Sequence, residues 1–383
     1  MEKREDILFD NQIEKNVNNY KKNTRSSCMY PECDTYTINS HTISEKVSLG
    51  QIAEEYHLFS PKSLRQYPDK DFYTDSIGIH DASTFKGFCS YHDGLIFNRL
   101  DHHSIISEKD IFRQCYRSIS YDLFHEELIN VIRPQLVNRL ENNFLAKISS
   151  NFKNNIIAQL DKAEEKIKYR LSTLQKIQAE IMEFIETMSD EDDAYTLTEF
   201  TGSEVPIYVA YKRLEFQIPV AISTKIGWIV KGEDDPIEIY VTVIPYQECT
   251  HFIIMKKQKT EDIAKLMNGD NLTFLDFVEK VLVYSDYWWL KPSIYKKLSN
   301  EKKQIFSDDL QFRDLFPDMN SFMNIKYDLT IFDDLRLELQ QGCSEEQLLT
   351  EKMRMKYLPV REAREERMKL MKERMYREIY GLR

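Results

Sequence analysis

Four side chains carrying the donor atoms that zinc prefers occur as two close pairs early in the chain. Cys28 and Cys33 flank Met-Tyr-Pro-Glu, whose proline favours a turn. Cys89 and His92 follow in the compact C-x2-H spacing. Zinc takes four tetrahedral ligands from Cys and His, with a thiolate sulfur about 2.3 Å from the ion, so its ligands come in close pairs on tight turns. We therefore expect these four residues to hold one structural zinc ion.

The two pairs are separated by residues 34–88, so the site requires an inserted segment whose ends come together. The other cysteines, Cys115, Cys249 and Cys343, are isolated and lack ligand spacing. The alternative is that the first pair are incidental thiols and that His92 is a surface residue.

A histidine between the two pairs could move protons. His41 stands in the run Ser-His-Thr-Ile, and an imidazole that titrates near neutral pH suits a general base. Two alternatives are that His41 is hydrogen-bonded inside the zinc turn, or that it replaces His92 as a zinc ligand. Asp101 and His102 are further candidate metal ligands. The adjacent His102 and His103 point in different directions on any regular element, so both rarely serve one ion.

The order of these motifs resembles the treble-clef zinc module of the HNH endonuclease superfamily. In zinc-bearing members a first Cys pair precedes a catalytic histidine in a short strand, and a second pair opens a helix. His41 stands in the position of that histidine. Asp93 follows the last predicted zinc ligand, where the family binds its catalytic divalent ion and where many members have histidine. The resemblance covers residues 28–93.

This resemblance implies metal-dependent cleavage of phosphodiester bonds. His41 would take a proton from water, and Mg²⁺ or Mn²⁺ held by Asp93 would stabilise the phosphate and the leaving oxygen. The family's central Asn has no clear counterpart between His41 and Cys89, where Ser83 or Thr84 occupies the corresponding region. The runs SHTIS and TFKGFC also resemble a group of bacterial proteins, and this likeness implies no function.

The wider pattern predicts an α+β fold with several parts. These are a polar leader (1–27), a small zinc-binding, HNH-like treble-clef module (28–110), a long helical and coiled-coil section (111–190), an antiparallel β-sheet with helices (196–340), and a charged helical C-terminal tail (344–383).

Apolar residues recur at heptad spacing in the helical section. The first row is Leu160, Ile167, Leu174, Ile181 and Met188, and the second is Ala163, Arg170, Ile177 and Phe184, which Arg170 interrupts. We expect this seam to be covered, either by a helix of the same chain after Ile111 or by a second copy in a homo-oligomer. Pro134 predicts a kink or break in the preceding helix.

After the acidic segment 189–195 the apolar period becomes two. Segments 205–223, 227–232 and 236–258 predict four or five antiparallel strands, with a turn at 232–236. Two of the three tryptophans lie in 284–292, which we expect to be a core or interface cluster.

Charge and hydropathy exclude some classes of protein. The net charge is −11, so nucleic-acid binding cannot be inferred from overall charge, although residues 351–383 contain eleven Lys/Arg against six Asp/Glu. The apolar stretches are far shorter than the roughly 20 residues of a membrane span, and the N-terminus has no apolar core typical of a secretory signal. Six cysteines without a disulfide framework fit a reducing compartment, so we expect a cytoplasmic protein.

Two functions follow as hypotheses. The first is a zinc-containing protein that acts on DNA or RNA, such as an HNH-like nuclease effector in bacterial defence against mobile DNA. The second is a non-catalytic binding or scaffold protein with a structural zinc, whose coiled coil and tail contact protein partners.

Overall fold

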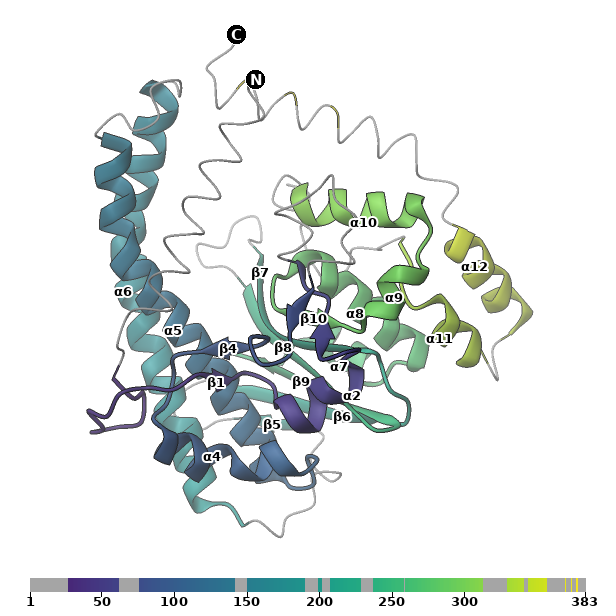
Figure 1. Ribbon diagram of the computed structural model, residues 1–383, viewed down its shortest axis with the longest axis horizontal. Helices are drawn as coiled ribbons and strands as arrows, with labels where there is room; N and C mark the ends of the chain where they lie inside the picture. The colour runs from purple at the N-terminus through teal and green to yellow at the C-terminus, as the bar shows by residue number, and fades with distance from the viewer. Residues whose placement is uncertain are drawn as a thin grey trace.

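The structure is a computed structural model of the 383-residue chain. It describes residues 27–61, 76–141, 150–189, 199–201, 207–228, 237–257, 259–312, 329–340 and 344–356, and the single residues Lys369, Glu373 and Arg377. The predicted leader, the turn at 232–236 and most of the basic tail therefore lie outside the described residues. The overall α+β class is confirmed (Figure 1).

A six-stranded antiparallel sheet lies at the centre of the molecule, in the order β10-β7-β8-β9-β6-β5 (Figure 1). Its strands are β5 (Glu199–Thr201), β6 (Tyr208–Leu214), β7 (Val220–Trp228), β8 (Ile237–Tyr246), β9 (Cys249–Lys256) and β10 (Trp288–Leu290). The sequence predicted four or five strands. The tryptophan segment is part of the core, as expected, and it also forms β10, which pairs with β7.

Both faces of the sheet are covered, which explains why every residue of β9 is buried. Along β6, Tyr208 and Ala210 face one apolar cluster, whereas Val209 and Tyr211 face another. The first cluster contains buried residues of α8 and of the helices around it. The helices in this region are α7 (Glu261–Met267), α8 (Asn271–Tyr284), α9 (Pro292–Lys297), α10 (Asn300–Phe312) and α11 (Asp333–Glu338).

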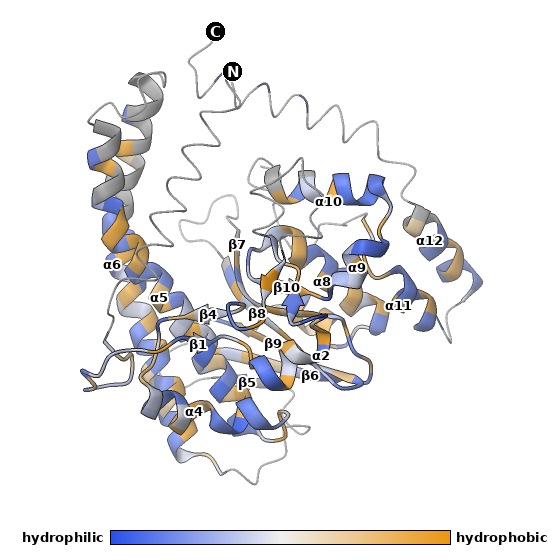
Figure 2. Ribbon diagram, viewed as in Figure 1, coloured by the Kyte–Doolittle hydropathy of each residue, from blue (hydrophilic) through white to orange (hydrophobic). Residues whose placement is uncertain are grey.

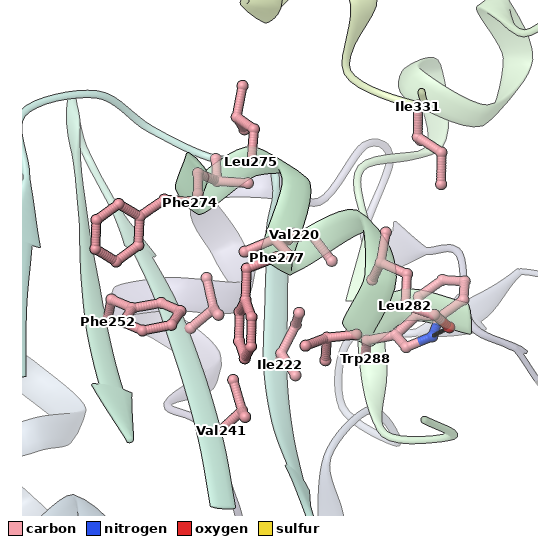
Figure 3. Packing of buried hydrophobic residues seen from close by; sticks show 14 of the residues in the cluster. Val220, Ile222, Val241, Phe252, Phe274, Leu275, Phe277, Leu282, Trp288 and Ile331 are labelled. Carbon is pink, nitrogen blue, oxygen red and sulfur yellow. Dashed lines mark hydrogen bonds between the residues drawn. The ribbon is translucent and has the colours of Figure 1, made fainter. Parts of the chain in front are cut away.

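Aromatic side chains fill the space between α8 and the sheet (Figure 3). The Phe252 ring meets the Phe274 and Phe277 rings edge-on, with centroids 5.1 and 5.8 Å away. Trp288 is fully buried, and its indole N–H donates to the carbonyl of Leu282 at 2.8 Å. The two residues thereby attach the edge strand β10 to α8.

Two long helices form a hairpin against the other face, and their far ends extend beyond the sheet (Figure 1). They are α5 (Glu108–Glu141) and α6 (Ser150–Thr187). Ile167, Leu174 and Ile181 of the predicted seam are buried, and α5 is the principal neighbour of α6. At these three positions the seam is therefore covered within the chain, whereas the side chains of Leu160 and Ala163 lie outside the described residues. Helix α5 continues through Pro134, so the predicted break is absent.

Arg170, the residue that interrupts the heptad pattern, joins the hairpin to the sheet. Its guanidinium lies 3.0 Å from Glu126 of α5 and 2.9 Å from Glu238 of β8. Lys225 of β7 and Asp122 of α5 form a second link at 2.7 Å. The charged side chain of Arg170 thus lies where α5, α6 and β8 meet.

Residues 27–61 and 76–107 lie beside the sheet as a small module. Strand β1 (Ser40–His41) pairs with β4 (Thr84–Phe85), and α4 (Ser90–His102) follows. The insertion between β1 and β4 contains η1 (Glu45–Leu49), α2 (Gly50–Ile52), β2 (His57–Leu58) and β3 (Ile77–Gly78).

The insertion is fixed to the edge of the sheet. Phe59 and Leu290 of β10 exchange backbone hydrogen bonds of 2.9 and 2.8 Å. Ile43 and Leu49 pack in one apolar cluster with Ala221 of β7 and Trp289 of β10. The module and the sheet therefore share a core and hold one another in place.

The tail begins as helix α12 (Glu345–Lys356), which Arg336 connects to α11 and α8. Figure 2 shows apolar residues concentrated on the strands and hydrophilic residues over much of α10 and α12. None of the described helices combines the length and the apolar character needed to cross a membrane.

Candidate metal centre

The first predicted ligand pair lies on a tight backbone turn. The amide of Cys28 donates to the carbonyl of Thr35 at 2.9 Å, and the amide of Cys33 donates to the carbonyl of Tyr30 at 3.2 Å. Glu32 has a φ of 58°, in the left-handed region, which lets the chain close the turn just before the second sulfur.

The second pair lies at the beginning of α4. Cys89 is the N-cap residue, and its Sγ accepts the amide N–H of His92 at 3.5 Å. The amide of Cys89 itself donates to the Sγ of Cys28 at 3.3 Å. The unpaired N–H groups and the dipole of a helix N-terminus favour negatively charged groups, here the sulfurs.

These elements bring all four predicted zinc ligands together. One ligand atom from each of Cys28, Cys33, Cys89 and His92 lies within 4.8 Å of all the others. The His92 Nδ1 atom is 3.6 Å from Cys28 Sγ and 3.4 Å from Cys89 Sγ, and the Sγ atoms of Cys33 and Cys89 are 4.0 Å apart. This is the only such group of His, Cys, Asp and Glu within the described residues.

The spacing of the donor atoms fits a tetrahedral zinc ion. Bonds of about 2.3 Å to sulfur and 2.0–2.1 Å to nitrogen give edges of about 3.8 Å between sulfurs and about 3.6 Å between sulfur and nitrogen. The observed distances lie close to both values. The Tyr30 ring stacks on the His92 imidazole, with centroids 3.9 Å apart and planes 9° from parallel, and so holds its orientation. The four residues form a Cys3His site that could hold a structural zinc.

The thiols of the turn have opposite electrostatic surroundings. Burial raises the pKa of Cys28 to about 11, whereas hydrogen bonds from Thr35 lower the pKa of Cys33. Zinc binds thiolates, so loading the site displaces protons from the thiols.

His41 lies outside the zinc centre and is not one of the four clustered residues. Its side chain is one-fifth exposed. Its Nδ1 atom lies 3.0 Å from the carbonyl oxygen of Ala82 and 3.1 Å from Ser83 Oγ. Burial, reinforced by the charge of Arg117, lowers the pKa of His41 below its ordinary value of 6.5. The direction of this shift favours the neutral imidazole at pH 7.

A carbonyl oxygen only accepts hydrogen bonds, so the neutral His41 ring carries its proton on Nδ1. The hydroxyl of Ser83 is consistent with this, because it donates to the carbonyl of Ile43 at 3.1 Å and offers a lone pair to His41. The lone pair of the ring is consequently on Nε2. Of the two residues named above at the position of the HNH Asn, Ser83 contacts His41, whereas Thr84 donates to the backbone carbonyl of Asp81.

Asp93 lies on the first turn of α4, in the same electrostatic neighbourhood as His41. Burial raises the pKa of Asp93 above its ordinary range, although a hydrogen bond from Ser40 and the charge of Arg117 oppose the increase. Its Oδ1 atom is buried and has no hydrogen-bond partner in the part of the chain that the structure describes. A carboxylate oxygen without a donor is a candidate ligand for a cation.

The further candidate ligands Asp101 and His102 form hydrogen bonds away from the zinc centre. Asp101 accepts two hydrogen bonds of 3.1 Å from the buried guanidinium of Arg117. The Nδ1 of the exposed His102 donates to the carbonyl oxygen of Asn98, in its own helix, at 2.8 Å. His103 is the exposed C-cap of α4. None of these residues joins the zinc ligands.

Comparison with family models, with curated proteins and with solved structures found no match for this chain.

Sequence reasoning did not select Glu45 and His80. The Glu45 carboxylate lies 3.4 Å from His41 Nε2 and 3.0 Å from His80 Nδ1. The spacing of His41 and Glu45 is four residues, which was visible in the sequence. His80 approaches only because the insertion folds back through β2 and β3.

Proposed function

We propose that the module acts on nucleic acid as a zinc-stabilised, metal-dependent nuclease, with His41 as its general base. The observation that carries this proposal is the 3.0 Å contact between His41 Nδ1 and the carbonyl oxygen of Ala82. The carbonyl of Ala82 holds the proton on Nδ1, so Nε2 keeps the lone pair that a general base requires. The lowered pKa keeps this lone pair available at neutral pH.

The zinc ligands and His41 have separate duties in this proposal. Cys28 and Cys33 hold the turn, Cys89 and His92 hold the start of α4, and β1 carries His41 between them. Zinc here supplies only cross-links between these segments. His41 would remove a proton from the attacking water, and it lies outside the zinc shell, so its basicity is not consumed by that metal.

Asp93 is the residue that we assign to a catalytic divalent ion. Its buried Oδ1 lacks a donor, and a hard cation such as Mg²⁺ or Mn²⁺ prefers carboxylate oxygen. When bound, such an ion supplies stabilisation of the charge that develops on phosphate. Ser40 donates to the same carboxylate and so orients it.

The test is a cleavage assay of the full chain on duplex DNA, single-stranded DNA and RNA, with Mg²⁺, with Mn²⁺ and with EDTA. Two results would support the proposal. Cleavage should require the divalent ion, and Asp93→Asn should need a higher Mn²⁺ concentration than wild type because it binds the ion more weakly. Absence of cleavage on every substrate under every metal condition would overturn it.

A second function is favoured by one surface feature. Six large apolar side chains among the described residues of the module are exposed, namely Tyr36, Ile38, Tyr56, Tyr91, Leu95 and Ile106. Tyr91 and Leu95 are four residues apart and share one side of α4. A zinc-supported surface of this kind suits a non-catalytic binding or scaffold protein, which is the conclusion if the cleavage assay is negative.

A further inference from the structure

Two imidazoles meet one carboxylate on the surface of the insertion. His41 Nε2 lies 3.4 Å from one oxygen of Glu45, and His80 Nδ1 lies 3.0 Å from the other. The three residues come from β1, from the start of η1 and from the turn after β3. None of them belongs to the Cys3His centre.

The contact between His41 and Glu45 places two lone pairs opposite one another. The proton of the neutral His41 ring is on Nδ1, where Ala82 and Ser83 accept it. A carboxylate oxygen is also an acceptor. This pair therefore lacks a hydrogen between its facing atoms, and a cation would satisfy both of them.

We propose that His41, Glu45 and His80 form a second, exchangeable site for a divalent transition-metal ion such as Zn²⁺ or Co²⁺. Two imidazoles and one carboxylate are a donor set suited to these ions, whereas Mg²⁺ prefers oxygen ligands. The site is distinct from the structural centre because it contains no thiolate and reaches the surface through His80.

The distance from each imidazole to its nearer Glu45 oxygen suits coordination of an ion, whereas the two imidazoles are too far apart to share one until His80 turns. With metal–ligand bonds of about 2.0–2.2 Å, a nitrogen–oxygen separation of 3.4 Å corresponds to an angle at the metal of about 110°, and one of 3.0 Å to about 90°. Both are ordinary angles between neighbouring ligands.

The site is less assembled than the Cys3His centre. Its three ligand atoms do not form a group within 4.8 Å of one another, as the zinc ligands do. The His80 side chain is 78% exposed, so it can turn toward His41 without leaving a packed position. We therefore expect weaker and readily reversible binding of the second ion.

Occupation of this site has a consequence that rests on the proposed nuclease function. A transition metal on Nε2 takes the lone pair that His41 needs as a general base. Excess Zn²⁺ would then inhibit cleavage, while Mg²⁺, a poor imidazole ligand, would not.

The binding test counts metal and does not depend on activity. Protein loaded with structural zinc is dialysed against increasing free Zn²⁺, and bound zinc is measured by elemental analysis. Wild type should approach two zinc ions per chain. Glu45→Gln and His80→Ala should retain one tightly bound ion and lose affinity for the second by at least about ten-fold.

The control is His57→Ala, which removes another exposed histidine of the same insertion. His57 Nδ1 contacts only a local carbonyl, that of Glu55, at 2.7 Å, so this variant should keep the second ion. Equal melting temperatures would show that Glu45→Gln, which preserves shape, remains folded. A wild type that saturates at one zinc, or a Glu45→Gln protein that still binds two with wild-type affinity, would overturn the site.

The two proposals fail separately. Two bound ions in a protein that cleaves nothing would leave the second site intact and remove the nuclease function. Cleavage by a protein that binds only one zinc would leave the nuclease function intact and remove the second site.

Discussion

The Nδ1 atom of His41 lies 3.0 Å from the carbonyl oxygen of Ala82. This one contact determines which nitrogen of the ring carries the proton, because a carbonyl cannot donate. The partner carbonyl belongs to the residues just before β4, which pairs with the strand that carries His41. The pairing of β1 with β4 thus sets the chemical state of the histidine as well as its position.

The first prediction concerns the pH dependence of cleavage. His41 acts as a base only when neutral, so the rate should fall as pH decreases through its pKa. Burial lowers that pKa from 6.5, so the acid limb of kcat/KM should have its midpoint below pH 6.5. Rates measured between pH 4.5 and 8, a range of about 2 units either side of an ordinary histidine, would show it. A midpoint above 6.5 would contradict the assignment.

The second prediction separates the zinc ligands from other thiols. Cys89→Ser should release zinc and unfold the start of α4, since metal binding in small zinc modules contributes about 10–16 kcal/mol to folding. Cys115→Ser changes a buried cysteine that is not one of the clustered ligands, and it should retain zinc. The measurements are zinc content and amide exchange in α4. Full zinc content in Cys89→Ser would remove Cys89 from the site.

The third prediction concerns the helical hairpin. Ile181 is fully buried in the cluster shared by α5, α6 and the sheet, so Ile181→Ala should lower the free energy of unfolding by about 2–5 kcal/mol. Lys176→Ala, on the exposed side of α6, should change it by less than about 0.5 kcal/mol. Denaturant unfolding gives both values. A small loss in Ile181→Ala would show that the seam is not packed in solution.

The fourth prediction concerns acid stability. His251 is buried between Ser104, 2.6 Å from Nε2, and Tyr211, 2.9 Å from Nδ1. Burial lowers its pKa from 6.5 to about 4. The unfolded chain therefore binds a proton at higher pH than the folded chain, and stability is lost as pH falls from 6.5 toward 4.

The lowering of the His251 pKa from 6.5 to about 4 corresponds to a loss of about 3 kcal/mol in the free energy of unfolding between these two pH values. Comparing the unfolding free energy of wild type and His251→Gln from pH 7 to pH 4 isolates it, because the carboxyl groups titrate in both proteins. The variant should lose less stability than wild type. Parallel curves would show that His251 does not titrate with folding.

The spacing of the zinc ligands could be predicted because each pair is local in the chain. Cys89 and His92 are three residues apart, and a turn or a helix start brings such residues together whatever the rest of the fold. That the two pairs meet across 55 intervening residues, 34–88, was an inference from metal chemistry. Their convergence in the structure depends on the pairing of β1 with β4.

Contacts created by tertiary structure could not be predicted. His80 and Ser83 reach His41 only through the folded insertion, and no periodicity marks them. Similarly, β10 was missed as a strand because Trp288–Leu290 is short, and the residues of β7 with which it pairs, Val220–Ile222, lie about 70 residues earlier. The heptad period predicted a covered seam, but it could not choose between α5 and a second chain.

The most direct measurement of the central claim compares cleavage by wild type, His41→Ala and His57→Ala, each analysed for zinc and melting temperature in the same preparation. Wild type and His57→Ala should cleave at similar rates. His41→Ala should be slower by about 10²–10⁴-fold, with its one structural zinc ion retained and its melting temperature nearly unchanged, because the general base belongs neither to the Cys3His centre nor to the core. If His41→Ala loses its zinc or unfolds, or if it cleaves as fast as wild type, His41 is not the general base and the nuclease account is wrong.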